Sequence, residues 1–136
     1  MKALDTNVLV RFLVCDDAPM TARTRHLFEQ ARDTAKPLLI SNLVLLETFW
    51  VLGYSYGFSR KAIVEAVGRL LSLPSVTFES HDLVKELVHI GLASTLDLAD
   101  ILIGLQAKTI GAEATLTFDN KAARSDLFEE VAPTPS

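Results

Sequence analysis

Short apolar runs alternate with stretches of helical periodicity along the whole chain. The apolar runs predict strands near residues 2–5, 37–41, 75–79 and 113–118, with a further edge strand near 128–131. The helical patterns predict helices near 7–14, 20–34, 43–55, 59–72, 80–91 and 96–109. This alternation is typical of an α/β fold whose sheet is mainly parallel.

Turn and cap residues mark the ends of several of these elements. Pro37 follows a helical stretch and marks the start of the second strand, because proline does not continue a helix. Gly111 is placed to cap the end of the helix near 96–109, and Ser41 and Asn42 are placed to cap the helix that follows them. No linker or repeat divides the 136 residues, which predicts one domain over residues 1–132 and a frayed tail at 133–136.

Five carboxylates occupy positions whose neighbours are apolar. Asp5 and Asp119 each end an apolar run that is predicted to be a strand, Glu47 interrupts an apolar helical stretch, and Asp97 and Asp100 begin the last helix. A carboxylate in apolar surroundings is costly unless a positive charge meets it, and no lysine or arginine stands beside these five at a helical spacing. Oxygen ligands without an internal cation indicate a bound divalent metal and metal-assisted chemistry.

The expected topology would bring these acids together. In a parallel α/β sheet, ligands gather at the carboxyl ends of the strands. Asp5 and Asp119 both end strands, Glu47 lies about two turns into the helix after strand 37–41, and Asp97 and Asp100 begin another helix. We therefore expect acids from four separate segments to converge at one edge of the sheet.

Two of the acids have an equally ordinary structural interpretation. Asp5 is well placed to cap the helix that begins near Thr6 or Asn7, and Asp119 is well placed to order a turn. Thr6, Asn7 and Thr117 flank these acids and could orient metal-bound waters, although each is also a normal helix-start or strand residue.

The remaining acids differ in how easily a structural role explains them. Ser94 and Asp97 have the spacing of a capping box with Ser94 as the cap, which leaves Asp97 an auxiliary role at the metal. Asp100 and Glu47 are harder to explain in this way, because their neighbours one helical turn away are apolar.

Half of the aromatic residues fall in one short window that ends a helix and begins a turn. Core packing explains some of them, and a concentrated aromatic patch is also a plausible surface for a protein partner. The residues of this window are Phe49, Trp50, Tyr54, Tyr56 and Phe58.

The charge balance changes if the five acids form one site. The net charge of −4 at first argues against a nucleic-acid partner. Setting the five carboxylates aside leaves 12 acidic against 13 basic residues, so the negative charge would be local to the metal. Basic residues recur near 23–32, 60–69 and 121–124, where they could contact phosphates or form ordinary solvated surface.

Other features limit the class of protein. The longest uncharged stretch, residues 48–59, is too short to span a bilayer, and no signal peptide opens the chain, so we expect a cytoplasmic protein without a membrane partner. The mean hydropathy of +0.29 favours a buried subunit interface. Cys15 is the only cysteine, which excludes an internal disulfide, and we expect it to be a small core residue. The three histidines are dispersed and indicate no acid/base dyad.

Four segments resemble, in order and in spacing, the acidic motifs of the PIN domain. They are LDTNVLV at 4–10, SNLVLLE at 41–47, DLADILI at 97–103 and TFDNK at 117–121. The chain is most similar to the ribonuclease toxins of bacterial toxin–antitoxin pairs, the VapC type, although phenylalanine is more usual at Leu98. The resemblance implies Asp5, Glu47, Asp100 and Asp119 as an acidic quartet with Asp97 as an auxiliary. It also implies a three-layer sandwich with a mainly parallel five-stranded sheet flanked by helices, a homodimer, and neutralisation by a cognate antitoxin.

The expected function is metal-dependent endoribonuclease activity, with Asp5, Asp100 and Asp119 holding one or two Mg²⁺ or Mn²⁺ ions and Glu47 as a further ligand or a base for the attacking water. Attack by water predicts 5′-phosphate and 3′-hydroxyl products. The alternative is a catalytically weak PIN-fold binding module that associates with a partner through the aromatic window. A phosphotransferase of the haloacid dehalogenase or receiver type is disfavoured, because position 7 is Asn and Asp5 is followed by Thr6.

Overall fold

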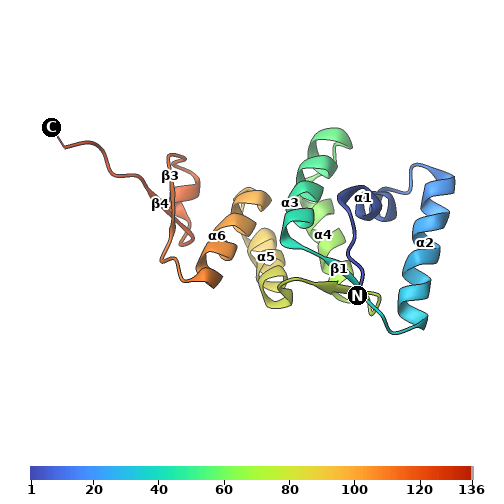
Figure 1. Ribbon diagram of the computed structural model, residues 1–136. Helices are drawn as coiled ribbons and strands as arrows, with labels where there is room; N and C mark the ends of the chain where they lie inside the picture. The colour runs from blue at the N-terminus through green and yellow to red at the C-terminus, as the bar shows by residue number, and fades with distance from the viewer. Residues whose placement is uncertain (136) are drawn as a thin grey trace.

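The structure is a computed structural model that describes residues 1–135, and it confirms the alternation of helices and short strands (Figure 1). The first half contains α1 (Thr6–Val14), α2 (Ala18–Asp33), β1 (Leu38–Ile40), α3 (Asn42–Trp50), a π-helical turn (Val51–Ser55) and α4 (Arg60–Leu71). The second half contains β2 (Val76–Phe78), α5 (His81–Ala93), α6 (Leu98–Ile110), β3 (Thr115–Thr117), a 3₁₀ turn (Ala122–Arg124) and β4 (Phe128–Glu130). The six predicted helices are all present, with bounds that differ by a few residues.

The strands form two separate parallel pairs. β1 pairs with β2, with Leu39 opposite Thr77, and β3 pairs with β4, with Leu116 opposite Glu129. The first predicted strand, 2–5, is reduced to a single parallel bridge between Ala3 and Leu39. The prediction of a five-stranded sheet in a three-layer sandwich is therefore wrong for this arrangement of the chain.

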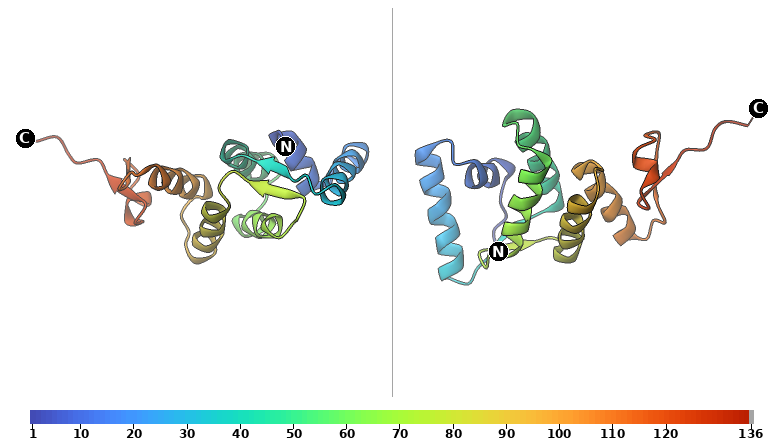
Figure 2. Two further views of the ribbon diagram at one scale, coloured as in Figure 1. Left: turned by 60° about the horizontal axis from the view of Figure 1, so that its bottom comes forward. Right: turned by 180° about the vertical axis from the view of Figure 1, so that it is seen from behind.

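The position of α6 explains why the sheet is divided. α6 packs against α3 and α5, and it buries Leu98, Ile101, Leu102 and Leu105 in the core. The β3–β4 pair follows α6 and lies at the opposite end of the molecule from α2, as the views of Figures 1 and 2 agree. The helices thus stand between β3 and segment 2–5, and burial of the α6 side chains holds them there.

The predicted helix ends are mostly confirmed. The Ser41 hydroxyl accepts the amide hydrogen of Val44 (3.2 Å), which caps α3 as expected. Gly111 ends α6 with a φ of 108°, a left-handed conformation that glycine adopts without strain. The prediction of a frayed tail at 133–136 includes Ser136, which lies outside the described residues. Within residues 1–135, no helix has the length and apolar character needed to cross a membrane.

Cys15 is exposed, so the expectation of a core cysteine is wrong. It ends α1 in a left-handed conformation, with a φ of 59°, and its amide donates to the carbonyl of Arg11 (3.2 Å). Its thiol donates to the carbonyl of Phe12 (3.5 Å) instead of packing in the core.

Candidate functional site

Three of the predicted acids lie close together, where α6 begins and β3 ends. Burial raises the pKa of the Asp100 carboxyl, and the neighbouring charges of Asp97 and Asp119 raise it further. No ion pair within residues 1–135 involves any of these three groups. The result is a local concentration of negative charge beside one cationic neighbour, Arg60, whose pKa burial lowers and the charge of Asp97 raises.

Asp97 caps α6 in addition to its place in this group. Its Oδ1 atom accepts the amide hydrogens of Ala99 (2.9 Å) and Asp100 (3.2 Å). The predicted capping box is wrong, because the Ser94 hydroxyl instead donates to the carbonyl of Ile90 at the end of α5 (2.9 Å). The two helices are separated by a break at 94–97, and Asp97 is the residue that satisfies the free amides of the second helix.

Asp119 is held in a fixed position at the end of β3. Its amide donates to the Thr117 hydroxyl (3.0 Å), and its Oδ1 atom accepts the amides of Lys121 (2.8 Å) and Ala122 (3.4 Å). The predicted turn role is therefore present. One carboxylate oxygen orders the backbone of the turn, and Thr117 supports the same turn from the strand.

Asp5 behaves differently from the other strand-end acid. It occupies the position before α1, but its side chain makes no capping hydrogen bond. Its backbone carbonyl accepts the amides of Val8 (3.1 Å) and Leu9 (3.2 Å). Thr6 is buried, while Asn7 is exposed. The Asp5 carboxylate is thus exposed and does not cap α1, so the capping interpretation is wrong.

Glu47 lies on an exposed face of α3. Leu43, Trp50 and Tyr54, spaced four, three and seven residues from Glu47, are also exposed, with 88% of Tyr54 accessible. Its apolar neighbours indicated a buried carboxylate, but Leu43 and Trp50 are exposed themselves because no element within residues 1–135 covers this face of α3. The expectation of a buried acidic cluster is wrong, since Asp5, Asp97 and Asp119 are exposed as well and Asp100 is half-buried.

The five acids do not converge within one chain. Among residues 1–135, no three histidine, cysteine, aspartate or glutamate side chains are placed to hold one metal ion. Asp97, Asp100 and Asp119 form one group, while Asp5 and Glu47 come from elements on the other side of the α3–α6 contact. As arranged here, the residues of a single chain do not fit a complete metal site.

A cleft between α1 and α2 adds residues that the sequence reasoning did not single out together. Its volume is about 610 Å³, and Arg11, Arg23 and His26 line it beside Asn7. Asn7 and Arg11 are one helical turn apart in α1, and Arg23 and His26 are one turn apart in α2. That same-face spacing was the signal available in the sequence. The cleft begins two residues after Asp5 and offers positive charge close to it.

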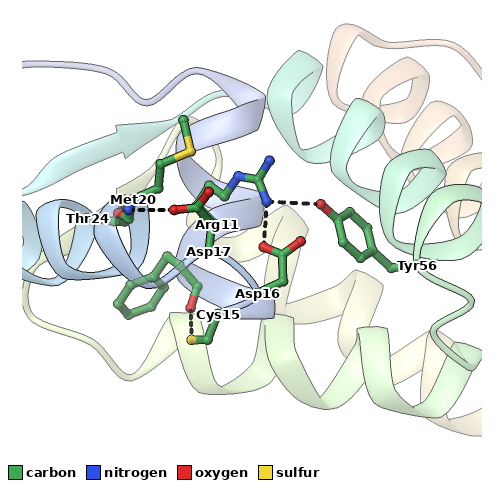
Figure 3. A network of polar contacts seen from close by, with 8 residues as sticks. Arg11, Cys15, Asp16, Asp17, Met20, Thr24 and Tyr56 are labelled. Carbon is green, nitrogen blue, oxygen red and sulfur yellow. Dashed lines mark hydrogen bonds and ion pairs between the residues drawn. The ribbon is translucent and has the colours of Figure 1, made fainter.

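Hydrogen bonds fix the orientation of Arg11 at the edge of this cleft (Figure 3). Its Nη1 atom donates to Asp16 (2.5 Å) and to the Tyr56 hydroxyl (3.3 Å). The hydrogen bond with Arg11 holds the pKa of Asp16 below its usual range. This network connects the end of α1 to the segment after the π-helical turn.

The aromatic window divides between core and surface. Phe49 is buried and contributes to no surface, while Tyr56 and Phe58 are half-buried. Trp50 and Tyr54 are exposed and line a smaller cleft of about 190 Å³ together with Arg60 and Asp97. The exposed aromatic pair therefore lies beside the acids at the start of α6.

Comparison with known proteins supports the family resemblance. The family model described as the PIN domain matches residues 2–127, nearly the whole chain. Comparisons with curated proteins and with solved structures give no match.

Proposed function

The chain belongs to the PIN-domain family, and from this membership we propose that it is a metal-dependent endoribonuclease that serves as the toxin of a toxin–antitoxin pair. PIN domains are typically metal-dependent nucleases. The observation on this chain that supports the proposal is the group Asp97, Asp100 and Asp119, three neighbouring carboxylates that form no ion pair within residues 1–135, although Arg60 lies near Asp97.

The acids are assigned roles according to their motif positions. Asp5, Asp100 and Asp119 would hold one or two Mg²⁺ or Mn²⁺ ions, with Glu47 as a further ligand or as the base and Asp97 as an auxiliary. The cation would supply a water of lowered pKa and offset charge on the phosphate. Because Asp5 and Glu47 stand apart from the other acids in one chain, the site is complete only when the two groups meet.

The cleft between α1 and α2 supports RNA as the substrate. Arg23 can neutralise a backbone phosphate there, whereas the charge of Arg11 is already met by Asp16, and Asn7 lines the cleft two residues after Asp5. Attack of water on phosphorus would break the P–O3′ bond and leave 5′-phosphate and 3′-hydroxyl ends. Thr6 and Thr117 would support the acids beside them, Thr6 from its buried position at the start of α1.

Nuclease assays with a matched control test this proposal. Wild-type protein should cleave RNA in Mg²⁺ or Mn²⁺ but not in EDTA, and Asp5→Asn should be inactive. Asp33→Asn is the control, because Asp33 is an exposed acid whose ion-pair partner is Arg32, its neighbour on α2. Equal cleavage by wild type, Asp5→Asn and the EDTA sample would show a contaminating nuclease and remove the proposal.

A protein partner is proposed for the exposed aromatic surface, defined by Trp50 and Tyr54. Large exposed aromatic side chains are typical of protein interfaces, and a cognate antitoxin that covers them would also cover Asp97 in the adjoining cleft. The alternative function, a binding module without strong catalysis, predicts that titration calorimetry detects the partner but no binding of Mg²⁺ or Mn²⁺.

A further inference from the structure

The edge of segment 2–4 has no partner on its outer side. The carbonyl of Lys2 accepts from Leu39 (2.9 Å), and the amide of Leu4 donates to Leu39 (2.9 Å). Because successive residues of a strand present their amide and carbonyl groups to opposite sides, the N–H and C=O groups of Ala3 point away from β1. No backbone group within residues 1–135 bonds to them.

β3 has a second edge of the same kind. The amide of Thr115 donates to Leu127 (2.9 Å), and the carbonyl of Thr117 accepts from Val131 (2.9 Å), so both residues bond to the β4 side. The N–H and C=O groups of Leu116, which lies between them, point away from β4. In the described part of the chain, β3 has β4 as its only neighbouring strand.

The β3 edge also exposes apolar side chains. Leu116 is 65% accessible, and Phe118 directly after the strand is 85% accessible. A two-stranded parallel pair is a marginal unit by itself, and an open strand edge of this kind is a template for pairing with another chain. The β3 edge therefore combines unpaired backbone groups with exposed apolar side chains, both of which a second strand would cover.

We propose that β3 of one copy pairs with segment 2–4 of a second copy, and that the exchange is reciprocal. All the observed pairings are parallel, so the joined sheet has the order β2, β1, segment 2–4, partner β3, partner β4. This is a five-stranded parallel sheet assembled across two chains. Each copy offers one edge of each type, so a two-fold dimer leaves neither edge open, whereas a one-way contact would extend into a fibre.

Pairing within one chain would cost buried contacts that pairing between chains keeps. Gly104 of α6 lies against Leu127 so closely that an added Cβ would be 2.8 Å from the Leu127 Cβ, so β3–β4 and α6 move together. α6 in turn buries Leu98, Ile101 and Leu105 in the main core. β3 reaches its own Ala3 only if these side chains leave the core, whereas a second copy brings its β3 without any such loss.

The exchange has a direct consequence for the acids. The outward groups can bond in two parallel registers, which place Ala3 opposite Thr115 or opposite Thr117. In the first register Asp5 is opposite Thr117, which leaves it about 7 Å from Asp119 along the strands. In the second register Asp5 is directly opposite Asp119. One copy would supply Asp5, and its partner would supply Asp119 with Asp100 and Asp97.

Engineered disulfides distinguish pairing between chains from pairing within one chain. The double variants Ala3→Cys/Thr115→Cys and Ala3→Cys/Thr117→Cys, in a Cys15→Ser background, place thiols opposite each other in the two registers. Neighbouring strands lie about 4.8 Å apart, within the Cα separation that a disulfide bridges. We expect one of the two variants to run as a covalent dimer on a non-reducing gel. A disulfide closed within a single chain would overturn the proposal.

A pair of proline variants tests the edge in solution by light scattering and sedimentation. Leu116→Pro removes the outward N–H of β3 and should convert the wild-type dimer to monomer. Glu130→Pro is the matched control, because it removes an N–H from the outer edge of β4 in the same two-stranded unit and should leave the dimer intact. A monomeric wild type, or a Leu116→Pro variant that remains dimeric, would overturn the proposal. If Leu116→Pro does not fold, the disulfide variants decide the question.

The strand exchange does not rest on nuclease activity, so the two proposals can fail separately. A dimer that exchanges strands but cleaves no RNA would retain the exchange and reject the function. A monomer that cleaves RNA in Mg²⁺ would do the reverse.

Discussion

Gly104 in the middle of α6 packs directly against Leu127, with room for no side chain between them. An added Cβ would lie 2.8 Å from the Leu127 Cβ and 3.1 Å from the Phe128 ring. This contact fixes the β3–β4 pair to α6, and it therefore decides where Asp119 lies relative to Asp100.

Gly104→Ala should destabilise the protein by about 1–3 kcal/mol, because the new methyl group overpacks this contact. Gly68→Ala in α4 is the control, since its nearest neighbour, Val88 Cγ1, would be an ordinary 3.9 Å away. That substitution should stabilise the helix by up to about 1 kcal/mol. Urea unfolding measures the free energy of unfolding of both variants. Equal values would show that the contact between Gly104 and Leu127 leaves room for a methyl group.

Asp100→Asn should raise the melting temperature at pH 7 in EDTA. Burial and the neighbouring acids raise the pKa of Asp100 in the folded protein above its ordinary value of 3.8, so the charged form is disfavoured by folding. The wild-type carboxyl therefore lowers stability as the pH rises through its folded pKa, and it has no such effect below pH 3.8.

The advantage of Asp100→Asn should accordingly shrink as the pH falls toward 3.8. Asp126→Asn, at an exposed turn position, is the control and should show little change across the same range. If the melting curves show that Asp100→Asn is less stable than the wild type at pH 7, they contradict the concentration of negative charge around Asp100.

Two inactive variants should complement each other if the sites are shared between copies. A dimer of one Asp5→Asn chain and one Asp119→Asn chain contains one site in which both acids are intact. Random mixing of unfolded and refolded chains should restore about a quarter of the wild-type nuclease activity. Each variant refolded alone should stay inactive, and a mixture without activity would mean that Asp5 and Asp119 act within one chain.

Arg23→Ala should weaken RNA binding, because Arg23 lines the cleft between α1 and α2. Arg25→Ala is the control, since Arg25 is exposed on the same helix but is not part of the cleft lining. In an Asp5→Asn background, which separates binding from cleavage, Arg23→Ala should reduce the salt dependence of the affinity by about one unit of slope. Equal effects of the two variants would exclude the cleft as the RNA path.

Local structure followed closely from the sequence. The six helices, the cap at Ser41 and the glycine at the end of α6 lie where periodicity and cap residues predicted them. The four acidic motifs were also visible without a structure, and the family match over residues 2–127 agrees with them. These features depend on interactions a few residues apart, which a sequence displays directly.

Only the tertiary structure determined which distant segments of the chain lie side by side. The pattern of Leu43, Glu47 and Trp50 indicated a buried face, yet this face of α3 is open to solvent. The short strands at 2–5 and 115–117 were equally compatible with one sheet or two, because any hydrogen bonds between these two strands would join residues more than a hundred positions apart. Burial of α6 against α3 and α5 settles this question, since a nonlocal packing energy, and not strand propensity, determines which edges can meet.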